Sequence, residues 1–192
     1  DVPPSPSDVR NLVNPESPSI GKGIVAEYGL LPDANPDDGV DTSGYKSTTG
    51  VITVQDPDGS GDLSSLILRF PQWAVDSSTG KPVDFTVDLV KLSAGETAII
   101  PVGVIDGLVD GSGNPIPQGN FTLLNYDPAT GKIDYIFELQ TRVDNDFPNE
   151  FGAVNNNDAT IPFEVVSVDA GGLQSEPAKG TIIIVDDIPQ IV

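Results

Sequence analysis

The sequence NFTLLNYDPATGKIDYIFELQ (residues 120–140) contains two apolar-rich segments that are joined by a turn. In residues 132–140 every second position is apolar, namely Ile133, Tyr135, Phe137 and Leu139. Alternation with a period of two indicates a strand with one buried and one solvated face. Between the segments, Asp127 precedes Thr-Gly-Lys, a pattern typical of a type I turn that glycine closes in the left-handed conformation. This stretch therefore predicts an antiparallel hairpin.

Similar short blocks recur along the chain, and no helical period accompanies them. Residues 76–81 (DSSTGK) repeat the turn pattern of residues 127–132. The content of 20 Gly and 18 Pro suits many short strands joined by turns. We expect an all-β, antiparallel β-sandwich with long Ca²⁺-ordered loops. Its strands are predicted at residues 23–29, 50–54, 65–70, 83–92, 97–105, 120–126, 132–140, 160–168 and 180–185.

The composition excludes several classes of function. The 192 residues carry 9 Lys+Arg and 29 Asp+Glu, a formal net charge of −20, and neither His nor Cys. Such a chain repels nucleic-acid backbones and anionic membranes, and it lacks an imidazole base, a thiolate nucleophile and the usual zinc ligands. No apolar run is long enough to span a bilayer. Asp supplies 22 of the 29 acids, and this excess of hard oxygen ligands indicates Ca²⁺.

Three regions are expected from proline content and from the two ends of the chain. Residues 1–20 contain five prolines and are predicted to be an extended linker or an edge strand. Residues 21–185 are predicted to form a single sandwich, and residues 186–192 an Asp-rich linker between modules. The step Asp-apolar-Pro occurs at residues 1–3 and again at residues 187–189, which favours one unit of a tandem array.

Two glycine-rich segments are candidate metal sites. Asp56, Asp58 and Asp62 are spaced by two and four residues in DPDGSGD, where the glycines permit a tight reversal, so their carboxylates could converge on one cation. The alternative is a polar hairpin turn with solvated carboxylates. Asp106 and Asp110 lie in a second long connection, which is either a wide hairpin loop or a wall of a ligand groove with both carboxylates on metal. The acidic segment of residues 33–41 is similarly ambiguous.

The densest group of oxygen ligands lies between residues 141 and 159. A connection of this length within a compact domain is usually functional or ordered by metal, because its backbone entropy must be offset. The alternative is a flexible polar insertion. We expect Ca²⁺ to fold this loop into a binding surface. The candidate metal ligands are Asp144, Asp146, Asn155 and Asp158, and the candidate ligand-binding residues are Asp110, Asp144, Asp146 and Asn156.

Three segments together resemble the repeats of RTX adhesins, the Ca²⁺-dependent bacterial surface proteins exported by type I secretion. They are TIIIV running into DDIP (residues 181–189), GVITV followed by the Asp-rich turn (residues 50–63), and VDAGGLQSE (residues 168–176). The last segment adds Asp169 to the candidate metal ligands. By this resemblance Asp186 and Asp187 would bind Ca²⁺ between neighbouring modules.

The resemblance implies an extracellular, non-enzymatic module on a bacterial cell surface. Its length exceeds that of a plain stalk extender, so we expect a ligand-binding domain similar to the peptide-binding type, monomeric, with peptide or protein C-termini and neighbouring adhesin modules as partners. A Ca²⁺ ion with an open coordination position would accept the C-terminal carboxylate of a peptide. The alternatives are a calcium-stiffened extender and a Ca²⁺-dependent carbohydrate-binding domain, for which Trp73 and Tyr45 could stack on sugar. The core is the more ordinary place for Trp73.

Overall fold

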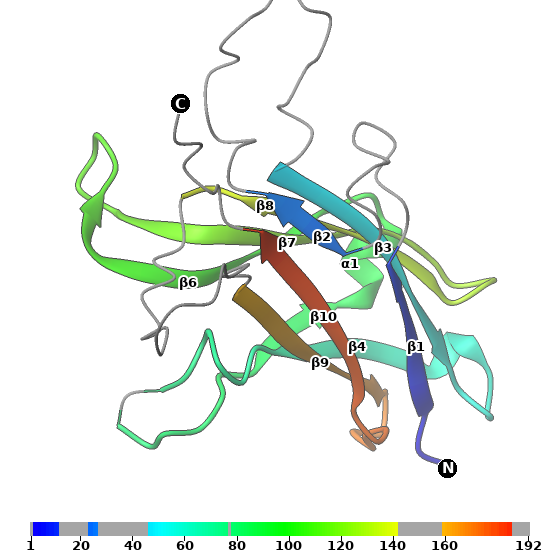
Figure 1. The fold of residues 1–192 in the computed structure, drawn as a ribbon. Helices are drawn as coiled ribbons and strands as arrows, with labels where there is room; N and C mark the ends of the chain where they lie inside the picture. The colour runs from blue at the N-terminus through cyan, green and yellow to red at the C-terminus, as the bar shows by residue number, and fades with distance from the viewer. Residues whose placement is uncertain (1, 12–22, 27–45, 77, 142–158, 186–192) are drawn as a thin grey trace, which may run out of the picture.

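Two five-stranded sheets pack face to face in the computed structural model, which describes residues 2–11, 23–26, 46–76, 78–141 and 159–185 (Figure 1). Sheet A contains, in spatial order, β1 (Ser5–Asn11), β3 (Ser47–Gln55), β8 (Lys132–Leu139), β7 (Pro115–Asp127) and β6 (Ala98–Val109). Sheet B contains, in spatial order, β2 (Ile24–Ala26), β10 (Ala178–Val185), β9 (Ala159–Asp169), β4 (Leu63–Arg69) and β5 (Phe85–Asp88).

This architecture confirms the predicted β-sandwich. Each predicted block overlaps an observed strand, and the pairs are antiparallel except β2 with β10, which is parallel. Within the segment predicted as linker or edge strand, residues 5–11 form β1, an edge strand that pairs with β3. The described part of the chain contains no helix with the length and hydrophobicity that crossing a membrane requires.

The strand expected over residues 83–92 is predicted too long, because it ends at Asp88. The next residues, Leu89–Ser93, form the short helix α1. The carboxylate of Asp88 accepts hydrogen bonds from the backbone amides of Val90 and Lys91, which is a helix N-cap. Leu89 and Leu92, three positions apart, are both buried on one side of this helical turn.

The turns follow the predicted chemistry. Asp127 Oδ1 accepts the amide of Ala129 at 2.9 Å, and Gly131 adopts φ 74° between β7 and β8. Asp76 Oδ1 accepts the amide of Ser78 at 2.7 Å, and Gly80 adopts φ 69°. Both aspartates therefore act as turn caps.

The core is an aromatic cluster between the sheets. The rings of Phe121 and Tyr135 stack with centroids 4.9 Å apart, and Phe163 from the other sheet lies 5.1 Å from Phe121. Phe70 contacts the same group at 5.5 Å from Phe121. All four are at most 1% exposed, as are the alternating apolar residues of β8. Burial of these large rings is the main source of stability in the sandwich.

Glycine makes room for this cluster. Gly50 on β3 faces Tyr135 on β8, and a Cβ at Gly50 would lie 2.1 Å from Tyr135 Cζ. Gly180 has the same relation to Phe163, at 2.3 Å. A methyl group at either position must displace a ring that is packed on all sides.

We predict that Gly50→Ala destabilises the sandwich by about 2–3 kcal/mol, because the added methyl group overpacks the aromatic core. Chemical denaturation in the presence of Ca²⁺ measures this effect. Gly111→Ala is the matched control, because nothing lies within 4 Å of a Cβ at that exposed turn position. Equal stability of the two variants would contradict the packing described here.

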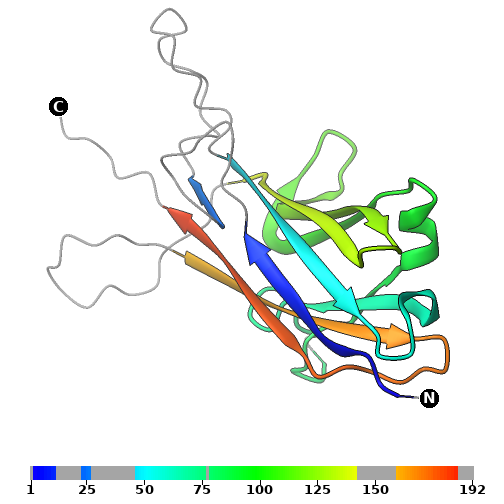
Figure 2. The ribbon, with the colours of Figure 1, turned by 90° about the vertical axis from the view of Figure 1, so that its right-hand side faces the viewer.

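The chain enters and leaves the described sandwich at opposite ends. β1 starts at the end that carries the connection between β3 and β4 and the turn between β9 and β10, and β10 finishes at the other end (Figure 2).

Candidate metal centre

Three aspartates converge at the end of the sandwich where β1 starts. One carboxylate oxygen each from Asp56, Asp62 and Asp169 lies within 4.8 Å of the other two. Asp56 follows the last residue of β3 in sheet A, whereas Asp62 and Asp169 border β4 and β9 in sheet B. The cluster therefore joins the two sheets at one point.

The connection between β3 and β4 positions Asp56 and Asp62. Asp56 Oδ1 accepts the amide of Asp58 at 2.9 Å, and the Asp56 carbonyl accepts the amide of Gly59 at 3.0 Å. Gly59 adopts φ 113°, a conformation that favours glycine, and its carbonyl accepts the amide of Asp62. This compact reversal brings Asp62 back to Asp56, and it is the tight reversal that the glycines of the segment predicted.

Pairing of β4 with β9 brings Asp169 to the same place. Leu63 lies opposite Asp169, and the Asp62 carbonyl accepts the amide of Ala170 at 2.7 Å. The hydroxyl of Ser64 donates to the Asp169 carbonyl at 2.9 Å. The carboxylate of Asp169 is held by its own turn, in which Oδ1 accepts the amide of Leu173 at 2.8 Å.

Two carboxylate oxygens in this cluster are buried without a hydrogen-bond donor from the protein. They are Asp169 Oδ2, whose residue is only 1% exposed, and Asp56 Oδ2. Burying a carboxylate costs several kcal/mol unless a donor or a cation compensates it, as an order of magnitude. Three such groups within one small volume also repel one another. A cation bound between them would relieve both costs.

The donor set fits a hard divalent cation. All three ligands are carboxylate oxygens, and the chain contains no His or Cys that would favour a softer metal. Ca²⁺ takes six to eight oxygens, so backbone carbonyls or water would complete the shell around three carboxylates. Ca²⁺ tolerates irregular geometry better than Mg²⁺, which suits two ligands from one connecting loop and a third from the end of a strand.

The structure places the other candidate ligand of this segment differently. Asp58 Oδ2 accepts the backbone amide of Val2 at 2.6 Å, and its carboxylate is not part of the cluster. Sequence spacing grouped Asp56, Asp58 and Asp62, but the third member in space is Asp169. No local sequence signal joins these positions, because their proximity depends on the register of β4 with β9.

Asp110 caps the turn between β6 and β7. Its Oδ1 accepts the amides of Asn114 at 3.0 Å and Ser112 at 2.8 Å. These backbone hydrogen bonds, that of Asn114 first, hold the pKa of Asp110 below its ordinary value. The carboxylate is fully exposed and occupied by its own turn, so its predicted metal and ligand-binding roles stay predictions. The long connection predicted from Asp106 onward is only a short turn, because β6 runs to Val109 and pairs there with Pro115, the first residue of β7. Asp106 therefore lies within β6, at a position whose side chain is not described.

The remaining candidate residues lie outside the described ranges, and their roles stay predictions. They are Asp144, Asp146, Asn155, Asn156 and Asp158 between β8 and β9, and Asp186 and Asp187 after β10. The same holds for residues 33–41 and for Tyr45.

Trp73 and Arg69 have structural partners. Trp73 is partly buried against the core, and its indole N–H donates to the Thr160 carbonyl at 2.9 Å. Arg69 forms an ion pair with Asp84, and this hydrogen bond raises the pKa of the guanidinium. Because Asp84 is half exposed, the pair contributes at most about 1 kcal/mol to stability.

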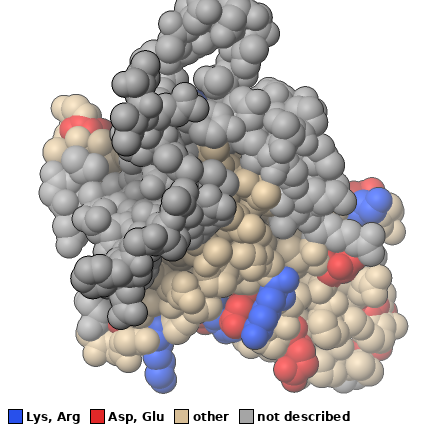
Figure 3. Space-filling model, in the orientation of Figure 1, with Lys and Arg blue, Asp and Glu red and all other residues tan. Residues whose placement is uncertain are grey.

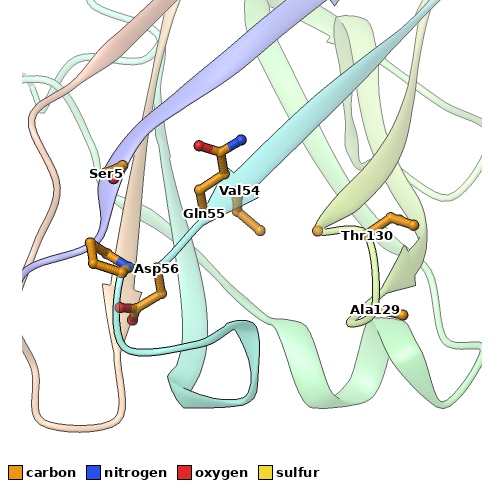
Figure 4. Close-up of a pocket in the computed structure, with 8 residues that line it drawn as sticks. Ser5, Val54, Gln55, Asp56, Ala129 and Thr130 are labelled. Carbon is orange, nitrogen blue, oxygen red and sulfur yellow. The ribbon is translucent and has the colours of Figure 1, made fainter.

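A cleft of about 330 Å³ borders Asp56. Its lining includes Ser5, Gln55 and Pro57, with Ala129 and Thr130 of the β7–β8 turn. Asp56 lines this cleft as well, and its carboxylate points away from these turn residues (Figure 4). On the molecular face shown in Figure 3, the described acidic and basic side chains are scattered among uncharged residues.

Comparison with known proteins assigns no family. No family model matches the chain, and no curated protein matches it. Among solved structures, the chain is similar to the CooA pilin subunit from enterotoxigenic Escherichia coli, at 12% identity and a TM-score of 0.26. That match covers 74% of this chain and 78% of the pilin chain, and at this TM-score it carries no functional argument.

We predict that Asp169→Asn removes one bound Ca²⁺ per chain, because it neutralises the most buried carboxylate while Oδ1 can still accept the amide of Leu173. Isothermal titration calorimetry with Ca²⁺ measures the stoichiometry. Asp134→Asn is the matched control, since that carboxylate bonds Asn125 on β7 and lies outside the cluster. An unchanged stoichiometry in Asp169→Asn would exclude a calcium site here.

Proposed function

We propose that this chain is a calcium-dependent module of a bacterial surface adhesin of the RTX type. One Ca²⁺ ion in this module would stabilise the end of the sandwich at which β1 starts. The observation that carries this proposal is the cluster of Asp56, Asp62 and Asp169, with its two buried carboxylate oxygens that lack donors. The resemblance of the Asp-rich turn and of the final strand to RTX repeats supports the same assignment.

The role of the ion would be to cross-link the sheets. Asp56 directly follows β3 of sheet A, Asp62 directly precedes β4 of sheet B, and Asp169 ends β9 of sheet B. A module without cysteine has no disulfide to perform this task. Extracellular Ca²⁺ modules bind with dissociation constants of about 10⁻⁴ to 10⁻³ M, so the site would fill outside the cell and empty in the cytosol.

The opposite positions of chain entry and exit support a place in an elongated array. Load or bending between neighbouring modules would reach the sandwich at β1 and at β10. A metal ion close to the start of β1 would restrict bending at that junction. The Asp-apolar-Pro steps at residues 1–3 and 187–189 favour such junctions at both ends.

Ligand binding remains part of the proposal. We propose a surface formed by residues 142–158, with Asp144, Asp146 and Asn156 near a Ca²⁺ ion that accepts the free carboxylate of a peptide. A carbohydrate with vicinal hydroxyls is the competing ligand, and a stalk extender without ligand is the competing role. Attachment to cells or surfaces, rather than catalysis, is the function that this arrangement would serve.

We predict that Ca²⁺ raises the thermal midpoint of the chain and that Asp169→Asn loses most of this gain. At a free Ca²⁺ concentration of 100 times the dissociation constant, one site that binds only the folded state adds about 2.7 kcal/mol. Thermal unfolding in Ca²⁺, in Mg²⁺ and in EDTA measures the difference. Identical midpoints in Ca²⁺ and EDTA would refute a stabilising calcium site.

We predict that the Ca²⁺-loaded chain binds short peptides with free C-termini and not their amidated copies. A peptide array probed in Ca²⁺ and in EDTA tests this, with Asp144→Ala and Asp146→Ala as variants at the proposed site. Binding that requires neither calcium nor the free carboxylate would contradict the proposed mode. An array without hits, followed by hits on glycans, would assign the carbohydrate alternative.

A further inference from the structure

The N-terminal strand β1 has few apolar anchors. Among the described side chains of residues 2–9, Pro4 is buried just before the strand, but none belongs to the core cluster of the two sheets, and Val9 is only partly buried against it. β1 is an edge strand of sheet A, and its register with β3 shifts between Ser5 and Asp8. Strands of this kind detach at low free-energy cost compared with central strands.

Polar contacts attach β1 at the end of the sandwich that carries the aspartate cluster, where apolar packing is sparse. The hydroxyls of Ser7 and Ser167 lie 2.8 Å apart in a buried hydrogen bond that ties β1 to β9. Ser167 is two residues from the metal-cluster residue Asp169 on β9, and both side chains are buried. The backbone amide of Val2 donates to the carboxylate of Asp58.

Both attachments lie next to the carboxylate cluster. Asp58 lies between the cluster residues Asp56 and Asp62 in one tight reversal, and the Asp58 amide is bonded to Asp56. Without a cation between the three carboxylates, their repulsion would act between this reversal and the end of β9, against the backbone hydrogen bond that joins them. The acceptor of Val2 lies on that reversal and Ser167 lies two residues from that end of β9, so this repulsion would weaken both attachments.

We propose that release of the metal detaches β1 from the sandwich while the rest of the two sheets stays folded. This inference rests on the proposed calcium site and adds a switch to it. The buried rings lie on β7, β8 and β9 and just after β4, and in their sheets these strands pair with neighbours other than β1. Detachment would uncover the outer edge of β3, a nine-residue strand that then has unpaired backbone groups.

Hydrogen exchange of the wild-type chain tests the switch directly. Backbone amides of residues 5–11 should exchange at least about tenfold faster in EDTA than in Ca²⁺, whereas those of β7 and β8 should keep their protection. Calcium titration calorimetry on the same sample separates the two claims. If no Ca²⁺ binds, the proposed function fails. If Ca²⁺ binds and β1 stays protected in EDTA, or if every strand loses protection together, the switch alone is refuted.

Thiol labelling gives a second measurement, because the chain has no natural cysteine. Val9→Cys places a thiol at a partly buried position of β1 that takes no part in the two attachments, and Val165→Cys places one in the core, where Val165 is 0% exposed. We expect EDTA to increase the labelling rate of Val9→Cys at least about tenfold and to leave Val165→Cys slow, as local opening requires. Equal rates for Val9→Cys with and without Ca²⁺ would overturn the switch.

Discussion

Mutual repulsion of three carboxylates at one end of the sandwich is the constraint on which this account depends. Asp56, Asp62 and Asp169 come from both sheets, and the chain brings them together through a tight reversal and the pairing of β4 with β9. Two of their oxygens are buried without a protein donor. Buried carboxylates without a partner lower the stability of the fold strongly. A bound cation is therefore expected to stabilise this arrangement.

Two different kinds of interaction stabilise the two parts of this protein. The aromatic cluster around Phe121, Tyr135 and Phe163 holds the sheets together by apolar burial, which needs no ion. The entry end is held by carboxylates, by buried hydroxyls and by the contact between Val2 and Asp58. This difference implies that removal of calcium affects the entry end of the sandwich and leaves the central strands folded. Apart from the buried Asp169, the described acids lie in turns or at strand positions that alternate with buried residues, such as Asp134 and Glu164, so the charge of −20 does not enter the core.

The sequence predicted those features that depend on residues close together in the chain. Alternation in residues 132–140 predicted β8 and its buried face, and the Asp-Thr-Gly-Lys pattern predicted two capped turns. The helix at Leu89–Ser93 was missed because one turn is too short to show a helical period, although Asp88 gave a usable capping signal. At the metal centre, the spacing of Asp56 and Asp62 was informative by itself. The spacing could not predict that Asp169 lies beside them, because this proximity depends on the pairing of strands that are far apart in the sequence.

The measurement that tests the central claim most directly is a crystal structure of the chain grown in millimolar CaCl₂, with anomalous data to identify the ion. The account predicts one Ca²⁺ bonded to carboxylate oxygens of Asp56, Asp62 and Asp169 at about 2.3–2.6 Å, with backbone carbonyls or water completing the shell. A well-ordered loop in which these carboxylates point apart, or enclose only water under the same conditions, would contradict it.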